Sequence, residues 1–372
     1  MRLTDIKFLK VIYRGRLVGL IFPYEDHTDF QYDKDWIANG FSVSPIKLPL
    51  KNGIFHSDKK YFGYLDGSFY DCLPDSWGNR LVDKWLLDNG YDPRYTSLFE
   101  RLSLLGETSL GGLDFEPSCK ICSDDDLDFD TLLDSCRSIE RNEPINQAAF
   151  SNLYSHSSSV GGSRPKVFVK IDGEDWILKF PSNRDPEWQS IMEYDYNVAA
   201  NACGLNVPPF RLMTTDKGIQ LFATKRFDRD KGKKVHVISL AGLTEVNIDY
   251  PQLDYLSFLQ ATGFLCKNDM EQALKLMIFN IKARNRDDHA RNISFYWNEE
   301  EKHYRLSPAY DLTYTPGIKE HALSCNWIGN PNDDDIVEVA KKVGFREKCV
   351  RDKISEIEKL TAPLEKYWGK YE

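Results

Sequence analysis

The chain has 372 residues, 41% of them hydrophobic, which is enough for two or three packed domains of roughly 100–200 residues each. Its 48 basic and 57 acidic residues leave a formal net charge of −9, which excludes a general attraction for nucleic acid or anionic membranes. No apolar run approaches the ~20 residues that span a bilayer, and the first residues lack the apolar segment of a signal peptide. We therefore expect a folded, cytoplasmic protein.

The eight cysteines give one pair with metal or redox spacing, Cys119 and Cys122. A zinc site would need a second such pair, which the remaining cysteines do not supply. The sequence therefore predicts free thiols, as in a reducing cytosol.

The first third of the chain alternates short strands with turns. Apolar residues alternate over residues 7–22 around a turn at 14–16, which predicts a β-hairpin, and short strands continue to about Gly67. A helix is predicted over 79–87. The acidic run 123–134 lacks the central glycine and terminal glutamate of an EF-hand loop, so it is interpreted as a linker and helix start, with a domain boundary near residue 119.

The middle of the chain predicts a loop, a hairpin, a helix and further strands. A small, polar, glycine-containing stretch at 157–165 leads into strands at 166–169 and 175–181, joined by a turn. A helix is predicted over 188–203, stopped by Gly204, and more strands end near Asp228. This order is that of a small lobe that holds a nucleotide.

The last third is predicted to be mainly helical, with helices over 254–265 and 270–283 and a strand pair before the final helices. Between them Asp287 and Asn292 stand five residues apart, the spacing of a protein-kinase catalytic loop, in which the Asp accepts the hydroxyl proton and the Asn holds magnesium. Asp311 is a second isolated carboxylate after a strand, where a kinase needs another metal ligand. Such ligands are required because the transferred phosphoryl group is anionic throughout.

Each upstream feature has an ordinary alternative. The glycine loop at 157–163 could approach a phosphate, but it matches neither a Walker A motif nor G-x-G-x-x-G, so a mobile loop is the simpler interpretation. Lys179, in an apolar strand, is either an edge-strand lysine or a phosphate-pairing lysine oriented by Glu193. His289 is better explained as a hydrogen-bonded structural histidine. The basic stretch 225–234 is interpreted as a solvated hinge loop.

The order of these features, from glycine loop to late Asp, is the order that a kinase fold demands. Six segments carry a family resemblance: 159–166, 178–181, 193–194, 226–229, 287–292 and 308–312. Four more lie upstream, at 29–33, 45–50, 73–77 and 105–117. With these segments the chain resembles the HipA family, serine/threonine kinases that act as toxins in bacterial HipBA-type toxin–antitoxin pairs.

The resemblance implies an α+β, protein-kinase-like bilobal fold, similar to HipA and phosphatidylinositol kinases. A mixed α/β N-terminal subdomain would occupy 1–118, a kinase N-lobe 119–228 and a mainly helical C-lobe 229–372. It implies ATP and Mg²⁺ as cofactors. The implied partners are a protein substrate of the translation machinery and a helix-turn-helix, HipB-like antitoxin, with DNA reached only through the antitoxin and no membrane.

The resemblance also assigns roles to residues. Asp287 becomes the catalytic base, Asn292 and Asp311 the magnesium ligands, and Ser159 the loop serine that is autophosphorylated to switch the kinase off, with Ser157 as the alternative. The residues expected to bind nucleotide are Val160, Gly161, Gly162, Ser163, Lys179, Glu193, Lys225, Phe227 and His289.

Two other functions stay open. The chain could be a degenerate kinase that mainly sequesters an antitoxin and helps it repress at DNA, although retention of Lys179, Asp287, Asn292 and Asp311 together favours the enzyme. A lipid kinase would share the same active-site logic, but the net charge of −9 and the lack of a basic amphipathic helix disfavour it.

Overall fold

The computed structural model describes residues 2–105, 109–118, 128–157, 164–247 and 253–369. The chain forms two compact units. Unit 1 comprises residues 1–187, 212–238 and 242–245, and unit 2 comprises 188–211, 239–241 and 246–372. The three predicted domains, 1–118, 119–228 and 229–372, remain a prediction, because compactness alone does not show which parts fold alone.

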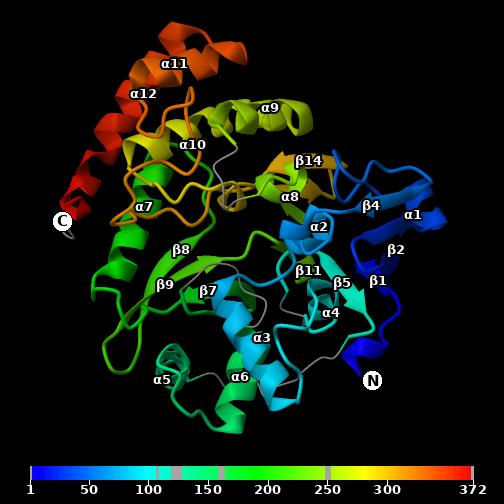
Figure 1. Cartoon of the computed structure of the whole chain (residues 1–372). Coiled ribbons are helices and arrows are strands. Elements are labelled where there is room, and N and C mark those ends of the chain that lie inside the picture. Colours follow the sequence, from blue (N-terminus) through cyan, green and yellow to red (C-terminus); the bar gives the residue numbers. More distant parts are fainter. Residues whose placement is uncertain (1, 106–108, 119–127, 158–163, 248–252, 370–372) are drawn as a thin grey trace. The chain divides into compact units, whose positions relative to one another are not determined.

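Unit 1 begins with an antiparallel five-stranded sheet in the order β4-β3-β2-β1-β5 (Figure 1). Its strands are β1 (Leu9–Tyr13), β2 (Arg16–Pro23), β3 (Thr28–Tyr32), β4 (Ile54–Ser57) and β5 (Leu113–Glu116). The predicted hairpin is confirmed: Arg14 and Gly15 between β1 and β2 both have positive φ, of 49° and 76°, as a tight turn matching the strand twist requires.

In the described part of the chain, six helices of unit 1 precede its second sheet in the sequence. They are α1 (Lys34–Asn39), α2 (Gly67–Tyr70), α3 (Ser76–Asp88), α4 (Leu98–Leu102), α5 (Phe129–Glu140) and α6 (Gln147–Ser157), with 3₁₀ turns η1 (Leu3–Asp5) and η2 (Lys60–Phe62). The predicted helix over 79–87 is confirmed as α3. Helix α6 was not predicted. Its buried Phe150, Leu153 and Tyr154 have helical spacing, but the serines among them make the segment resemble a polar loop.

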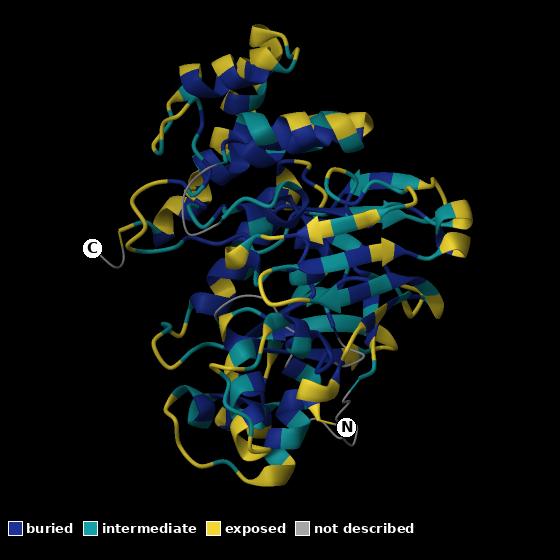
Figure 2. Cartoon of the chain, turned by 45° about the vertical axis from the view of Figure 1, so that its right-hand side comes forward, coloured by how far each residue is buried: buried dark blue, intermediate teal, exposed yellow. Residues whose placement is uncertain are grey.

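The second sheet has four strands in the order β6-β7-β9-β8. Its strands are β6 (Lys166–Ile171), β7 (Glu174–Lys179), β8 (Phe210–Thr214) and β9 (Gln220–Lys225), followed by the short hairpin of β10 (Arg229–Asp230) and β11 (Lys233–Lys234). The predicted β6–β7 hairpin is confirmed, and its turn residues Asp172 and Gly173 both have positive φ. Burial along the strands can be followed in Figure 2.

Unit 2 is mainly helical, as predicted for the end of the chain. Its helices are α7 (Gln189–Ala202), α9 (Tyr255–Leu265), α10 (Met270–Lys282), α11 (Asp333–Lys342) and α12 (Glu347–Thr361), with η3 (Lys267–Asp269), η4 (Ala290–Asn292) and η5 (Ala362–Tyr367). Its hairpin consists of β13 (Ser294–Asn298) and β14 (His303–Leu306). The chain crosses between the units through β12 (Val237–Ser239) and α8 (Leu240–Thr244).

The core of unit 2 centres on α10, where Leu274, Met277, Ile278 and Phe279 are fully buried. Tyr196 of α7 donates a hydrogen bond to the carbonyl of Ala283 just beyond the end of α10 at 2.7 Å, which ties these two helices together. The described residues include no helix with the length and apolar character that crossing a bilayer requires. The described cysteines carry free thiols, as predicted, at positions 72, 136, 203, 266, 325 and 349.

A buried carboxyl begins α2 in unit 1. Asp66 accepts hydrogen bonds from the Ser68 amide at 2.8 Å and the Ser68 hydroxyl at 2.6 Å, and only 1% of the residue is exposed. Glu245 lies nearby, with Oε1 accepting the Gly67 amide at 3.2 Å. Burial, reinforced by the Glu245 charge, raises the pKa of the Asp66 carboxyl from 3.8 to about 8.

Asp66→Asn should therefore change how stability depends on pH. The folded protein keeps the Asp66 proton to about pH 8, whereas the unfolded chain releases it near pH 3.8, so wild-type stability falls as pH rises through this range. Asparagine keeps the acceptor oxygen and has no proton to lose. We expect the melting temperature of the variant, relative to that of the wild type, to increase between pH 6 and pH 9, as measured by circular dichroism. A difference that stays constant with pH would contradict this.

Candidate active site

The start of the segment 285–292 is hydrogen-bonded to the end of α10. Arg284 takes a left-handed conformation with φ of 52°, which reverses the chain. The Asn285 amide then donates to the Asn280 carbonyl at 2.9 Å, and its side chain donates to the Asn280 side-chain oxygen at 3.0 Å. These contacts hold the start of the loop against the end of the helix.

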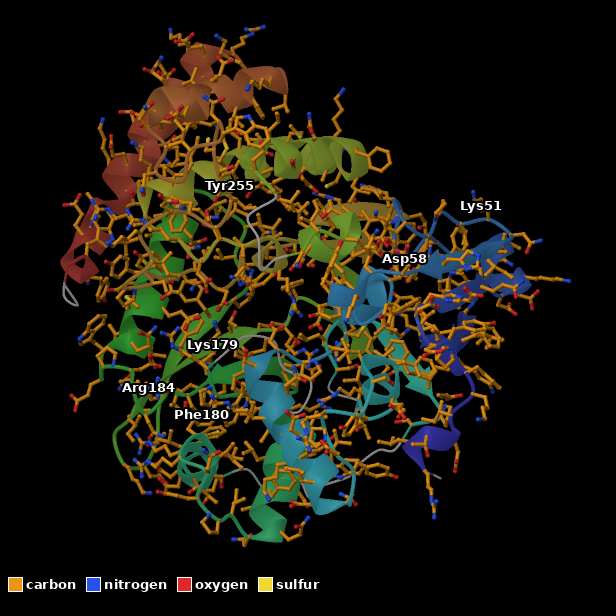
Figure 3. All side chains as sticks on the ribbon, in the orientation of Figure 1. Lys51, Asp58, Lys179, Phe180, Arg184 and Tyr255 are labelled. Carbon is orange, nitrogen blue, oxygen red and sulfur yellow. The ribbon has the colours of Figure 1, made fainter. Side chains whose placement is uncertain are left out.

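Asp288 anchors the loop from within unit 2. Its side chain is fully buried and accepts hydrogen bonds from the Tyr255 hydroxyl, from Nδ1 of His321 at 2.8 Å and from the Ala322 amide at 2.8 Å. Figure 3 marks Tyr255 on α9. Burial, with the Asp288 charge beside it, raises the pKa of the Tyr255 hydroxyl, so it remains a donor. Asp288 is therefore a structural carboxylate.

Asp287 differs from its neighbour in exposure, with 42% of its side chain open to solvent. Its main-chain carbonyl accepts a hydrogen bond from Nδ2 of Asn292 at 2.8 Å, and the Asn292 amide nitrogen in turn bonds the carbonyl of His289 at 2.8 Å. The turn η4 thus folds Asn292 back onto Asp287, which explains why these residues stand five apart. Because Nδ2 is the donor, Oδ1 is the atom of Asn292 suited to a metal ion.

His289 lies beside the carboxylate of Asp287, with Nε2 at 3.8 Å from Oδ1. Its Nδ1 is buried and has no hydrogen-bond partner among the residues that the structure describes. The sequence predicted a hydrogen-bonded structural histidine here, whereas the described residues supply no partner for Nδ1 of His289. A bound ligand would supply that partner.

Asp311 follows β14 in a segment that is fastened to the Asn292 loop. The Tyr310 hydroxyl bonds the Arg291 carbonyl at 2.7 Å and the Ser294 hydroxyl at 2.6 Å. Asp311 itself has a φ of 56°, a left-handed conformation that is uncommon outside glycine and concentrates at functional sites. Asn292 and Asp311 offer an amide oxygen and a carboxylate, the hard oxygen ligands that suit Mg²⁺.

Two of the predicted nucleotide residues, Lys179 and Lys225, lie on the second sheet of unit 1. Lys179, which Figure 3 labels, ends β7 and pairs in register with Phe222 of β9. Its ammonium lies 5.7 Å from the centroid of the Phe222 ring. Lys225 forms an ion pair with Glu174 at 2.8 Å, and Phe227 is half-buried. Glu193 is buried on α7 of unit 2, so its predicted pairing with Lys179 stays a prediction.

Several predicted residues lie outside the described ones: Ser159, Val160, Gly161, Gly162 and Ser163, and the pair Cys119 and Cys122. The alternative acceptor Ser157 is described. It ends α6, is fully buried, and donates from its hydroxyl to the Lys166 carbonyl at 2.5 Å.

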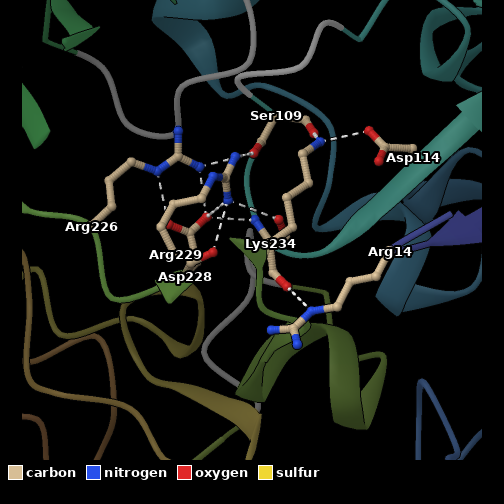
Figure 4. A network of polar contacts seen from close by, with 8 residues as sticks. Arg14, Ser109, Asp114, Arg226, Asp228, Arg229 and Lys234 are labelled. Atoms are coloured by element: carbon tan, nitrogen blue, oxygen red, sulfur yellow. Dashed lines mark hydrogen bonds and ion pairs between the residues drawn. The ribbon is translucent and has the colours of Figure 1, made fainter. Parts of the chain in front are cut away.

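A buried charge network in unit 1 was not predicted (Figure 4). Asp228 accepts hydrogen bonds from Nε and Nη2 of Arg226 at 2.8 and 2.7 Å, from Arg229 at 3.0 Å and from the Gly111 amide at 2.8 Å. Both arginines also donate to the Ser109 carbonyl, at 2.9 and 2.8 Å. The interpretation of 225–234 as a solvated hinge loop is therefore wrong for these residues, which bind the stretch to the 109–114 segment.

The network keeps Asp228 ionised. Burial alone would raise the pKa of its carboxyl, but the guanidinium groups of Arg226 and Arg229 outweigh burial and lower the pKa to about 2. The Arg226 guanidinium also lies 3.8 Å from the centroid of the Phe168 ring on β6, so it links the network to the second sheet. The sequence feature that indicates the Arg226–Asp228 ion pair is the placement of two opposite charges two residues apart, on either side of Phe227.

Comparison with known proteins places the chain in a family. The model of the HipA N-terminal domain matches residues 9–116, and that of the HipA-like C-terminal domain matches residues 158–363, more than half of the chain. The chain therefore belongs to the HipA family, as its motifs predicted. A search of the curated proteins found no match.

A solved structure shares the fold of this chain. HipA from the Shewanella oneidensis MR-1 toxin–antitoxin complex of HipA, HipB and operator DNA has a TM-score of 0.69 at 16% identity, over 96% of this chain and 90% of that chain. At this identity the likeness shows a shared mixed α/β fold. The Helicobacter pylori proinflammatory kinase CtkA has a TM-score of 0.39 at 14% identity, over 54% of this chain and 90% of that one, too low to support an argument.

Proposed function

We propose that the chain is an ATP- and magnesium-dependent serine/threonine protein kinase of the HipA toxin type, with the two units forming a kinase-like bilobal fold. The observation that carries the proposal is the division of labour between two consecutive carboxylates. Asp288 is buried and holds the loop, whereas the side chain of Asp287, next to Asn292 and His289, is 42% exposed. A surface loop without a catalytic role has no need to present one carboxylate on such a rigid support.

In the proposed mechanism Asp287 accepts the proton of the substrate hydroxyl as it attacks the terminal phosphate. Asn292 and Asp311 would hold magnesium, which neutralises phosphate charge when it is bound. His289, with its unsatisfied Nδ1, would donate to the nucleotide. Lys179 would pair with the phosphates.

The remaining nucleotide contacts follow from the family resemblance. They are assigned to Val160, Gly161, Gly162, Ser163, Glu193, Lys225 and Phe227. Ser159 would be the residue that the kinase phosphorylates on itself. The buried hydroxyl of Ser157, bonded to the Lys166 carbonyl, supports Ser159 over Ser157, because phosphorylation of Ser157 would require the end of α6 to open.

The proposed partners are a protein substrate of the translation machinery and a HipB-like antitoxin, with DNA reached through the antitoxin, all within the cytoplasm. The solved HipA of the HipA–HipB–operator complex supports the antitoxin, because its likeness extends over 96% of this chain.

Binding of ATP should stabilise the protein strongly only when magnesium is present. Without the ion the carboxylate of Asp311 would face the phosphates, and the like charges would repel. A saturating analogue at about 100 times its Kd stabilises by about 2.7 kcal/mol, a shift readily seen in a melting curve. We expect this shift with a non-hydrolysable ATP analogue and Mg²⁺, and its loss in Asp311→Ala.

The matched control is Asp352→Ala, an exposed carboxylate on α12 of the same unit. With the ATP analogue and Mg²⁺, the melting temperature of this variant should rise by as much as that of the wild type. Equal shifts with and without magnesium, or an undiminished shift in Asp311→Ala, would count against the metal site.

The second candidate, a binding module for the antitoxin, is favoured by the same complex. Growth of a bacterium expressing the chain alone separates the two functions. We expect arrest with the wild type and normal growth with Lys179→Ala at equal expression, because the phosphate-pairing charge is lost. Arrest that persists with the lysine variant would favour the binding module.

A further inference from the structure

A second cluster of possible metal ligands lies in unit 1, at strands β3 and β4. It is more than 200 residues away in sequence from the Asp287 loop. Side chains on a strand alternate between faces, so His27, just before β3, lies on the same face as Asp29. Thr28 and Phe30, between and after them, are buried, so this face is the solvent side. His56 of the edge strand β4 is the register partner of Asp29.

The three side chains converge. Nε2 of His27 lies 3.5 Å from Oδ1 of Asp29, and Nδ1 of His56 lies 2.5 Å from the same oxygen. One ligand atom from each residue lies within 4.8 Å of the others. Two ligands of one tetrahedral zinc ion stand about 3.3 Å apart, given bonds of about 2.0–2.1 Å, so the His27–Asp29 pair already has the spacing of a shared ion.

A further contact points independently to a metal ligand. Nδ1 of His27 lies 2.8 Å from Oδ1 of Asp26, so in the tautomer with its hydrogen on Nδ1 the ring donates to Asp26 and Nε2 is the nitrogen that can bind a metal ion. Such a carboxylate behind a histidine is the usual support of a metal-bound imidazole. The Tyr24 ring stacks on His27 at 4.5 Å between centroids with an interplanar angle of 4°, which fixes the imidazole plane.

We propose that His27, Asp29 and His56 bind one divalent transition-metal ion of the zinc class. Two imidazoles and one carboxylate suit zinc, nickel or copper rather than Mg²⁺ or Ca²⁺, so this site differs in metal from the proposed magnesium site of unit 2. On binding, the His56–Asp29 hydrogen bond is exchanged for two bonds to the ion. For Nδ1 of His56 to bind the ion, the imidazole carries its hydrogen on Nε2.

The exposed fractions of the side chains, 31% for His27, 13% for Asp29 and 67% for His56, leave a fourth position open to water. Three protein ligands with one open position are the pattern of an accessible zinc ion rather than of a closed structural centre.

The test is a zinc titration of the metal-stripped full chain without an affinity tag, by calorimetry. We expect His27→Ala and His56→Ala each to bind one ion fewer per chain than the wild type. Asp26→Asn should weaken this ion about 10- to 100-fold, the usual effect of removing the group behind a ligand. Zinc held elsewhere, for example at exposed Cys349, persists in every variant and cancels in the comparison.

The control is His303→Ala, which removes a half-buried histidine 3.1 Å from Glu301 and should leave the count unchanged. Cobalt added to the same proteins gives a second readout, a visible absorption band for tetrahedral nitrogen and oxygen ligands that the His27 and His56 variants lack. The same ion count and the same cobalt band in the wild type and both histidine variants would overturn the proposal.

Discussion

Asp287→Ala should lower phosphate transfer to protein by about 10²- to 10⁴-fold, the usual contribution of a positioned general base. The affinity for Mg·ATP should change little, because Asp287 acts on the incoming hydroxyl and not on the nucleotide. Initial rates of transfer from labelled ATP, together with calorimetry of a non-hydrolysable analogue, measure the two effects separately.

The neighbouring carboxylate provides an internal contrast. Asp288→Ala should lower thermal stability, because it removes the acceptor for the Tyr255 hydroxyl, the His321 ring and the Ala322 amide. Asp352→Ala should affect neither property. A variant at Asp287 that transfers phosphate at close to the wild-type rate would show that the roles are assigned wrongly.

Asp228→Ala should destabilise the protein by about 3–5 kcal/mol, because removing one partner of a buried ion pair leaves an uncompensated charge. Here two guanidinium groups, those of Arg226 and Arg229, would lose their carboxylate, and the Gly111 amide would lose its acceptor. Urea unfolding followed by fluorescence measures the change in the free energy of unfolding.

The exposed Asp230, two residues further on, provides the matched control, and Asp230→Ala should change stability little. The sign of the pH dependence follows from the pKa of Asp228, which is lowered from 3.8 to about 2. Its stabilisation is present at neutral pH and is lost as pH falls from about 4 toward 2. An Asp228 variant as stable as the wild type at pH 7 would contradict this interpretation of the network.

Local patterns predicted the regular elements well. The hairpins β1–β2 and β6–β7 and the helices α7, α9 and α10 follow from apolar spacing and turn residues that lie within one segment of sequence. Family membership was also predictable, because the motifs at 287–292 and 308–312 are specific in combination. The roles of Asp287, Asn292 and Asp311 remain predictions.

Contacts between distant segments were not predictable. Asp288 is identified as the structural carboxylate only by Tyr255 and His321, each 33 residues away in sequence. Asp228 meets the Gly111 amide, 117 residues away in sequence, and the His27 cluster depends on the register of β3 with β4. In each case the sequence shows the side chain, but tertiary packing decides whether it faces solvent, a partner or a ligand.

Incubation of the purified wild type with γ-labelled ATP and magnesium, alone and with cell lysate, followed by mass spectrometry to locate the label, tests the proposed kinase activity. We expect label on serine or threonine of protein, dependent on magnesium, and absent with Asp287→Ala. Folded wild type that binds Mg·ATP yet transfers no label to itself or to any lysate protein would contradict it.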